Sequence, residues 1–182
     1  MVDPGKAELR ARLSEARRAR PAQEIEAARV AVRAAILERC ATSGWRCVAA
    51  YVPLRTEPGS FELLDAMAAA GIRVLVPVVL PDRSLDWADW AAPDSGTGAL
   101  GADEIAKADA VLVPALAVAF DGTRLGRGGG SYDRALPRAN PDAPRVVLVY
   151  DDEVLPSLPR EPWDFPVTGL VTPTRSRDLP IG

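Results

Sequence analysis

Residues 60–79 read SFELLDAMAAAGIRVLVPVV, and this stretch decides the fold class. Its first half has the composition of a helix, with Ser60 as the N-cap and Gly71 as the stop. Its second half, residues 72–79, is a run of β-branched and apolar residues, which predicts a buried strand. A helix followed directly by a buried strand is the repeating unit of α/β proteins, in which helices cover a parallel sheet.

Other apolar runs along the chain have the length of buried strands. They lie at residues 47–52, 110–113, 143–150 and 167–171. Because helical segments separate several of them, we predict a single three-layer α/β/α domain over residues 1–182 with a mainly parallel central sheet.

Two helices are expected before the first strand. Residues 4–19 repeat apolar side chains at helical spacing, and a second helix starts at Pro21. The side chains expected to face inward are Leu9, Leu13 and Ala16 in the first helix and Ile25, Ala28, Val32 and Ile36 in the second.

Composition excludes several classes of protein. The 182 residues are 48% hydrophobic and 26% charged, which suffices for a sizeable core, and a net charge of −3 gives no global attraction to nucleic acid. Histidine is absent, which removes Ser-His-Asp and Cys-His catalysis and the usual zinc sites. No window approaches about 18 uninterrupted apolar residues. We therefore expect a cytoplasmic protein that acts on small molecules, without membrane or nucleic-acid partners.

The glycine-rich stretch 124–134, RLGRGGGSYDR, is the strongest candidate for chemistry. Glycines let the main chain approach phosphate oxygens closely, and arginines supply forked donors that match phosphate geometry. The patterns GxxxxGK[ST] and GxGxxG both fail here. The stretch therefore predicts a polyphosphate site of another kind, with a glycine-rich surface turn as the alternative. Asp133, next to it, either binds Mg²⁺ or caps a helix.

Basic residues and tryptophans elsewhere leave two further alternatives. Lys6, Arg10 and Arg17 share one side of the first helix, where they serve either an anionic ligand or a solvated helix face. The segment 81–101, rich in Gly, Pro and Asp, breaks the strand pattern. Its Trp87 and Trp90 either stack on a ligand or pack at a core edge.

Residues 114–134 closely resemble the 5-formyltetrahydrofolate cyclo-ligase (methenyltetrahydrofolate synthetase) family, whose signature is P-x-L-x-F-D-x-x-G-x-R-L-G-R-G-x-G-Y-Y-D-R. Here the segment is PALAVAFDGTRLGRGGGSYDR, and Pro114, Gly122 and Arg124 fall in register without a gap. Three other segments are similar to the family: the Lys6–Arg10 pair, YVPLRTEPGSFELL and EPWDFPVTGLVTP.

The resemblance implies an enzyme that uses ATP and Mg²⁺ to convert 5-formyltetrahydrofolate into 5,10-methenyltetrahydrofolate, ADP and phosphate. It implies Arg127 as the catalytic residue, Val52 and Glu57 as contacts to folate, and Asp133 and Asp164 as ligands of Mg²⁺. The expected ATP-binding residues are Lys6, Arg10, Arg124, Leu125, Gly126, Arg127, Gly128, Gly129, Gly130, Ser131 and Tyr132.

The chain departs from the family at four places. Ser131 replaces the first tyrosine of Y-Y-D, and Phe120-Asp121 comes two residues late. Ala92-Pro93 stands where the family has E-P before the glycine loop, and Trp163 stands where the family has histidine. The first two departures favour an alternative, a non-catalytic relative that binds nucleotide or folate. A nucleotide-dependent ligase or kinase with a non-folate substrate is the other alternative.

Overall fold

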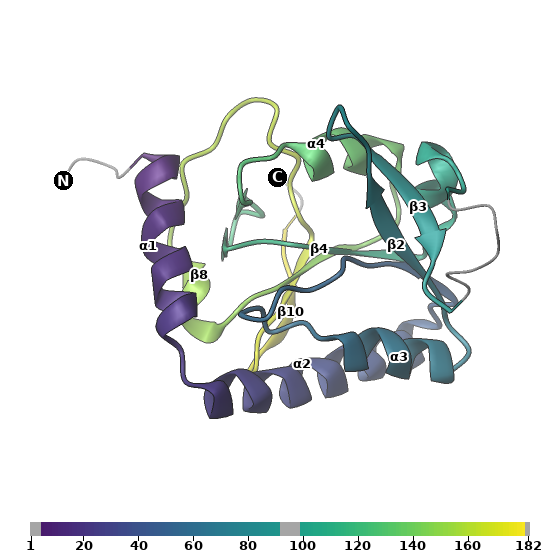
Figure 1. Cartoon of the computed structure of the whole chain (residues 1–182), viewed down its shortest axis with the longest axis horizontal. Coiled ribbons are helices and arrows are strands. Elements are labelled where there is room, and N and C mark those ends of the chain that lie inside the picture. Colours follow the sequence, from purple (N-terminus) through teal and green to yellow (C-terminus); the bar gives the residue numbers. More distant parts are fainter. Residues whose placement is uncertain (1–4, 92–98, 181–182) are drawn as a thin grey trace.

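The computed structural model describes residues 5–91 and 99–180, and its centre is a seven-stranded sheet in the order β10-β9-β7-β4-β1-β2-β3 (Figure 1). The pairings from β9 through β7, β4 and β1 to β2 are all parallel, whereas the edge strands β3 and β10 run antiparallel to their neighbours. The strands are β1 Cys47–Ala49, β2 Arg73–Val79, β3 Leu85–Asp89, β4 Ala110–Val113, β7 Arg145–Leu148, β9 Gly169–Val171 and β10 Ser176–Asp178. The predicted mainly parallel sheet is confirmed.

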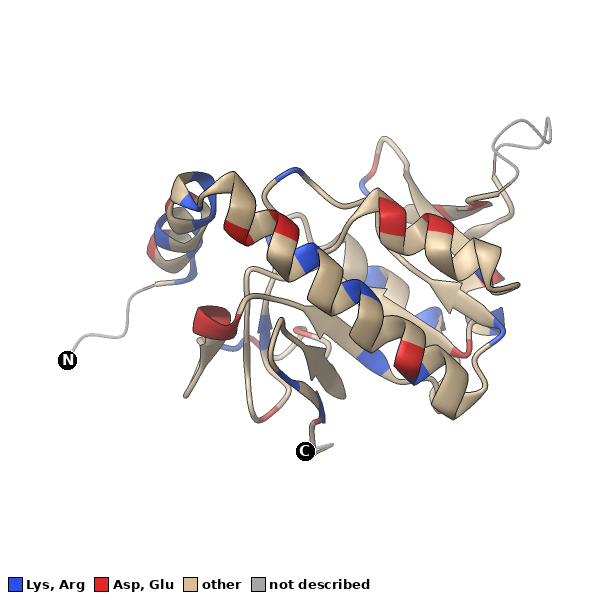
Figure 2. Cartoon of the chain, turned by 90° about the horizontal axis from the view of Figure 1, so that it is seen from below, with Lys and Arg blue, Asp and Glu red and all other residues tan. Residues whose placement is uncertain are grey.

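One face of this sheet is covered by two helices, α2 (Ala22–Ser43) and α3 (Phe61–Ala69). Figure 2 shows them side by side over the sheet, with acidic and basic residues on their outer surface. The Ser60 hydroxyl accepts a hydrogen bond from the Leu63 main-chain N–H, so Ser60 caps α3 as predicted. The chain turns out of the helix at Gly71, whose φ is +79°.

The opposite face carries short helical segments in place of long helices. They are η1 (Ala102–Lys107), α4 (Ser131–Ala135) and η2 (Leu136–Arg138). Side chains alternate between the two faces because of the strand period of two: Val48 packs with α2 and α3, whereas Ala49 packs with the short helices. This alternation explains why the inner strands are apolar throughout.

A second, smaller sheet orders as β6 (Arg124–Leu125), β5 (Ala117–Ala119) and β8 (Val154–Leu155), with η3 (Asp151–Glu153) just before β8. The helix α1 (Lys6–Ala19) packs against it: Leu9 and Leu13 share a hydrophobic cluster with Leu116 and Leu125. This contact fixes α1, and with it the basic residues that the sequence singles out, beside the glycine-rich stretch.

Some expectations for α1 and α2 need correction. Ala16 is exposed, and Arg17 occupies the buried stripe in its place. Arg17 therefore does not share the polar side of Lys6 and Arg10. In α2, Ala28, Val32 and Ile36 are buried as expected, but Ile25 is only half-buried.

Within the segment 81–101, β3 (Leu85–Asp89) forms the second arm of a hairpin, because it pairs antiparallel with β2. Trp87, on β3, is fully buried in the core, and the half-buried Trp90 stacks on Phe61 with ring centroids 5.8 Å apart. Core-edge packing is thus correct for both tryptophans, and residues 92–98 lie outside the described part of the chain. Among the described helices, none is long and apolar enough to cross a membrane.

Candidate active site

A cleft of about 740 Å³ lies beyond the carboxyl ends of three neighbouring strands of the large sheet. Tyr51 and Val52 follow β1, Val79 ends β2 and Pro114 follows β4, and all four line the cleft. Residues 126–130, which we call the glycine loop, line it as well. Ligands of open α/β sheets bind at this edge. The glycine loop does not follow β4 directly, however, because the β5–β6 hairpin intervenes.

The structure brings all of the predicted site residues around this one cleft. They come from α1, the segment after β1, the glycine loop with its flanks, and the segment before β9. The most distant pair, Lys6 and Asp164, is separated by 158 residues in the sequence. The predicted residues that line the cleft are Lys6, Arg10, Val52, Glu57, Arg124, Leu125, Gly126, Arg127, Gly128, Gly129, Gly130, Ser131, Tyr132, Asp133 and Asp164.

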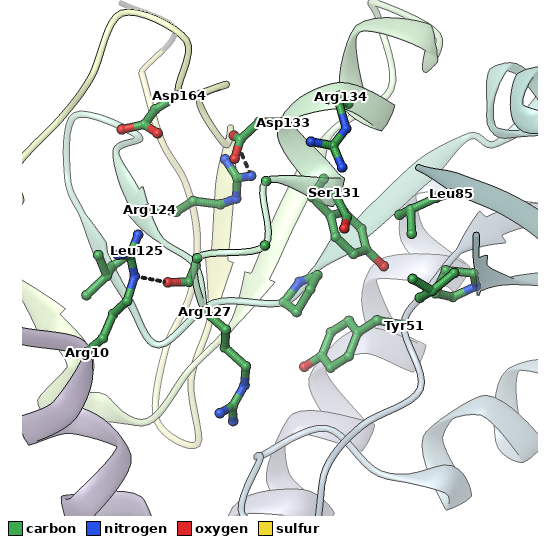
Figure 3. A pocket seen from close by; sticks show the side chains of 18 of the residues that line it. Arg10, Tyr51, Leu85, Arg124, Leu125, Arg127, Ser131, Asp133, Arg134 and Asp164 are labelled. Atoms are coloured by element: carbon green, nitrogen blue, oxygen red, sulfur yellow. Dashed lines mark hydrogen bonds and ion pairs between the residues drawn. The ribbon is translucent and has the colours of Figure 1, made fainter. Parts of the chain in front are cut away.

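The glycine loop presents main-chain donors that the protein leaves free. Within the described residues, no N–H group of positions 126–130 donates a hydrogen bond to another protein group. Gly128 and Gly130 have φ angles of +99° and +67°, which glycine adopts without strain. Arg10 holds the start of the loop, since its Nε donates to the Gly126 carbonyl oxygen at 2.8 Å (Figure 3). Free main-chain amides beside arginines are typical of anion-binding sites.

Lys6 reaches the cleft between two carboxylates. Its Nζ lies 2.5 Å from Asp164 Oδ2 and 2.9 Å from Glu161 Oε2. Burial alone would lower the pKa of Lys6, but the hydrogen bonds and charges of these carboxylates outweigh burial and raise it. For Asp164, burial opposes ionisation, yet the Lys6 hydrogen bond and the Glu161 main-chain N–H lower the pKa of the carboxyl group. Both groups are held in their charged forms.

Asp133 is tied to Arg124 at the start of the glycine-rich stretch. Arg124 Nη2 donates to Asp133 Oδ1 at 2.7 Å, and the same oxygen accepts the Phe165 main-chain N–H at 3.1 Å (Figure 3). Arg124 is itself buried and also donates to the Phe165 carbonyl oxygen. The side chain of Asp133 is therefore fixed in place before any ligand binds.

No ready-made metal centre exists among the described residues, because no three Asp, Glu or Cys side chains gather closely enough to hold an ion. Mg²⁺, however, commonly binds one or two carboxylates together with substrate phosphates and water. Asp133 and Asp164 fit that incomplete kind of site: each uses one oxygen in the contacts described above, and both line the cleft.

Glu57 and Arg127 meet at the opposite side of the glycine loop. Arg127 Nη2 lies 3.2 Å from Glu57 Oε1, and the Leu54 main-chain N–H donates to Glu57 Oε2 at 2.9 Å. Glu57 is almost fully buried, whereas the Arg127 side chain is 42% exposed. The pair therefore joins a buried carboxylate to a partly exposed cation at the wall of the cleft.

Tyrosines add a polar rim to an otherwise apolar part of the cleft. Burial, together with the charge of Glu57, raises the pKa of both Tyr51 and Tyr132 well above that of free tyrosine, so both hydroxyls stay protonated. The Tyr132 hydroxyl has no hydrogen-bond partner among the described residues. It is thus a buried polar group beside the cleft that the described protein leaves without a partner.

Comparison with known proteins identifies the family. The sequence profile of the 5-formyltetrahydrofolate cyclo-ligase family matches residues 2–173. The chain belongs to this family. It is 40% identical to the 5-formyltetrahydrofolate cyclo-ligase of Mycolicibacterium smegmatis over 96% of this chain and 97% of that protein. A shorter match to the Escherichia coli K12 enzyme of the same name is 35% identical over 39% of this chain and 40% of that one.

Solved structures of methenyltetrahydrofolate synthetases share the fold. The Aquifex aeolicus protein superposes with a TM-score of 0.79 at 26% identity, covering 97% of this chain and 94% of that one. The Mycoplasma pneumoniae protein gives a TM-score of 0.80 at 21% identity, covering 93% and 99%. The resemblance inferred from the sequence is thus confirmed, as are the fold class and membership of an enzyme family.

Several cleft residues of this cyclo-ligase family member were not anticipated. Most are apolar residues at or near the ends of strands. Sequence patterns assign such residues to the core, but they do not indicate which end of a strand lies at a ligand site. Glu161 and Arg134 lie within the matched motifs. Glu161 is close in sequence to Asp164 and Arg134 is close to the glycine loop, and this closeness could have indicated that both line the cleft. The unanticipated residues are Tyr51, Leu54, Pro77, Val79, Leu85, Pro114, Arg134, Glu161 and Trp163.

The displaced Phe120-Asp121 pair lies in the β5–β6 turn and does not line the cleft. The Asp121 carboxylate accepts the Thr123 main-chain N–H at 2.9 Å, and Phe120 stacks under Arg177 with the guanidinium 5.3 Å from the ring centre. Trp163, in contrast, is 67% exposed at the edge of the cleft. Of the departures within the described residues, Ser131 and Trp163 therefore alter the lining of the cleft, and Ala92-Pro93 lies outside the described part of the chain.

Proposed function

We propose that this protein converts 5-formyltetrahydrofolate to 5,10-methenyltetrahydrofolate in a reaction that consumes ATP, requires Mg²⁺ and releases ADP and phosphate. The observation that carries the proposal is the glycine loop, whose N–H groups make no hydrogen bond within the described protein although they line a cleft with Lys6, Arg10 and Arg127. The relative from M. smegmatis, named 5-formyltetrahydrofolate cyclo-ligase, supplies the reaction.

ATP would bind at the glycine-rich stretch, where positive charge and free amides meet. Free amides of residues 126–130 accept the phosphate oxygens, and Lys6 and Arg10 approach the same anion from α1. The remaining nucleotide contacts fall to Arg124, Leu125, Ser131 and Tyr132, which flank the glycine loop.

The folate half uses the segment after β1. The pterin ring carries N–H donors, and a buried carboxylate such as Glu57 is a matching acceptor. Val52, half-exposed on the cleft wall, offers apolar contact to the ring. Folate and nucleotide would then meet at the Glu57–Arg127 pair.

The chemistry asks for positioning and charge neutralisation rather than for a reactive side chain. The formyl oxygen of the substrate attacks the γ-phosphoryl group of ATP, and ADP leaves. N10 then attacks the activated formyl carbon and gives up its proton to water. The C–O bond breaks, and the former formyl oxygen departs in inorganic phosphate. Arg127 stabilises negative charge on the transferred group, so the absence of histidine is no obstacle.

Mg²⁺ supplies charge neutralisation between the triphosphate and the carboxylates of the cleft when it is bound. Asp133 and Asp164 are the residues that would hold it, because both line the cleft beside the proposed phosphate site. Their contacts with Arg124 and Lys6 orient the carboxylates and keep Asp164 ionised.

One observation favours a second candidate, a non-catalytic relative that binds nucleotide or folate without turnover. Ser131 places a small polar side chain in the cleft where the family has a tyrosine, so one aromatic contact is missing. A ligase or kinase acting on a non-folate acceptor is the third candidate on the same grounds.

A turnover assay separates these candidates. Purified protein is mixed with 5-formyltetrahydrofolate and Mg·ATP, and the near-ultraviolet absorption of the methenyl product is followed. We expect product, and we expect Arg127→Ala to lower kcat by roughly 10²–10³-fold, the usual effect of losing a transition-state donor. Arg18→Gln is the control, since Arg18 is exposed on α1 and pairs with Glu15 away from the cleft.

Each other outcome selects a different candidate. ATP binding without product supports the non-catalytic relative. ADP release that requires another acceptor supports the third candidate. An Arg127→Ala variant as active as the wild type would remove Arg127 from the catalytic step.

A further inference from the structure

A row of buried charges stands behind Glu57. Arg17 is 1% exposed, Glu153 is 2% exposed and Glu57 is 3% exposed. Arg17 forms a bidentate ion pair with Glu153, since its Nε and Nη2 each donate to a different carboxylate oxygen at 2.7 Å. Nη2 also donates to the Ala115 carbonyl oxygen at 2.8 Å. Charged groups are buried at this depth only when they are paired, so the row has a fixed geometry.

The row reaches the cleft through one carboxylate oxygen. Glu57 Oε1 lies 3.6 Å from Arg17 Nη1 on its buried side and 3.2 Å from Arg127 Nη2 on its cleft side. The two arginines differ in freedom, because the side chain of Arg17 is 1% exposed and that of Arg127 is 42% exposed. Glu57 thus has one fixed cation and one cation that can leave.

In the proposed function, Arg127 stabilises negative charge on the transferred phosphoryl group. A side chain that turns toward that group would turn away from Glu57, which would then keep Arg17 as its neighbouring cation. Arg17 Nη1 makes no hydrogen bond among the described residues. It is therefore a buried donor, 3.6 Å from Glu57, that can close on the carboxylate when Arg127 withdraws. Without it, a nearly buried carboxylate would be left without a charged partner, which is unfavourable.

We propose that Arg17 is a positioning residue, which holds the Glu57 carboxylate in place for the pterin ring while Arg127 engages ATP. The inference rests on the proposed function, because it uses the roles of Glu57 and Arg127 given there. It adds a residue on the buried side of α1 that touches neither substrate. It also explains why a cation continues the apolar stripe of α1.

The alternative is that Arg17 only fastens α1 to the core. Glu153 Oε2 also accepts the Tyr150 main-chain N–H at 2.8 Å, so the Arg17–Glu153 pair does have an anchoring role. The two roles differ in what they change. A loosened α1 would weaken the binding of both substrates, because Lys6 and Arg10 lie on the same helix. Loss of the Arg17 charge beside Glu57 would weaken the binding of the folate substrate alone.

Two variants and a control make the test. Arg17→Gln with Glu153→Gln removes one positive and one negative charge together, so no uncompensated Glu153 carboxylate remains. Arg17→Lys keeps the charge, but a single ammonium cannot serve Glu153, Ala115 and Glu57 at once. Arg18→Gln is the matched control, because Arg18 is the next residue on α1 and its side chain is 63% exposed.

The measurement is the Michaelis constant for each substrate in proteins shown to be folded by a thermal scan. We expect the double variant to raise KM for 5-formyltetrahydrofolate about tenfold or more, with KM for ATP changed by no more than about twofold. Arg17→Lys should raise the folate KM roughly threefold or more, and Arg18→Gln should leave both constants unchanged. If the double variant does not fold, Arg17→Lys decides by itself.

A folded variant at Arg17 whose folate KM equals that of the wild type would overturn the inference. So would equal increases in both constants, which would assign Arg17 to anchoring alone. Wild-type protein that forms no methenyl product would instead refute the proposed function, and this inference with it.

Discussion

Asp164 depends on its neighbours for its charge. Burial by itself would raise its pKa, but hydrogen bonds from the Lys6 ammonium and the Glu161 main-chain N–H lower it. A carboxyl group whose pKa is lower in the folded than in the unfolded chain stabilises the fold. That stabilisation is complete above the unfolded pKa, about 3.9, and is lost as the pH falls through the folded value.

We therefore expect Asp164→Asn to lower Tm by about 2–4 °C at pH 7, which corresponds to ~1 kcal/mol for a chain of this length. The difference from wild type should vanish as the pH falls from about 4 to 2, because both proteins then lack the charge. Thermal scans of the two proteins across this pH range check the prediction. A difference that persists unchanged at the acid end would show that the Asp164 charge is not its source.

At the scale of single residues, the family motifs predicted residues that line one cleft, but sequence analysis missed the buried position of Arg17, which helical spacing already implied. All predicted site residues line the cleft because they belong to contiguous family segments. Arg17 follows Leu9 and Leu13 at a constant spacing of four, which places it on the buried stripe of α1. Arginine is usually exposed, so sequence analysis places Arg17 in solvent. It is buried because it pairs with Glu57 and Glu153, which are distant in the sequence.

Among the elements, β3 is one that sequence analysis left unassigned. β3 buries Leu85 and Trp87 with Asp86 between them, which is the period of a strand. The run is five residues long and lies within a segment rich in Gly, Pro and Asp, so the turn signals concealed it. Tertiary packing on β2 then decides its structure.

Trp87 tests this account of β3. The indole is fully buried between the sheet and the short helices, so Trp87→Ala should lower the free energy of unfolding by about 3–5 kcal/mol. Trp87→Phe should cost less, because the indole N–H has no hydrogen-bond partner among the described residues. Urea titrations measure both. The control is Trp163→Ala, at 67% exposure, for which a change within about 0.5 kcal/mol is expected.

A loss at Trp87→Ala no larger than that of the Trp163 control would contradict the burial of β3. It would also reopen the interpretation that Trp87 serves a ligand. The three variants together thus separate a core tryptophan from a surface one.

For the molecule as a whole, the layer arrangement followed from the sequence and the strand order did not. The inner strands are similar apolar runs, so nothing in their composition places β4 between β1 and β7. The small sheet was missed because its strands are only two or three residues long, too short to show a period. That sheet nevertheless matters for the site, since it holds α1 beside the glycine loop.

The assembled cleft combines free main-chain amides with fixed carboxylates, and this combination predicts how nucleotide binding depends on metal. A triphosphate at the glycine loop would face the negative charges of Asp133 and Asp164 unless a cation lies between them. Ligand that binds only the folded chain stabilises it by ~2.7 kcal/mol at 100 times its Kd, or roughly 5–10 °C in Tm here. We expect Mg·ATP to give such a shift and ATP with EDTA to give much less.

Asp133→Asn separates the metal from the general charge of the site. The variant removes a carboxylate beside the phosphates while Arg124, its partner, stays in place. We therefore expect the Tm shift by ATP to depend less on Mg²⁺ than in the wild type, because less negative charge needs to be neutralised. Thermal scans across a Mg²⁺ titration at fixed ATP check this. A titration identical to that of the wild type would remove Asp133 from the metal site, and equal stabilisation by ATP with and without Mg²⁺ would remove the metal itself.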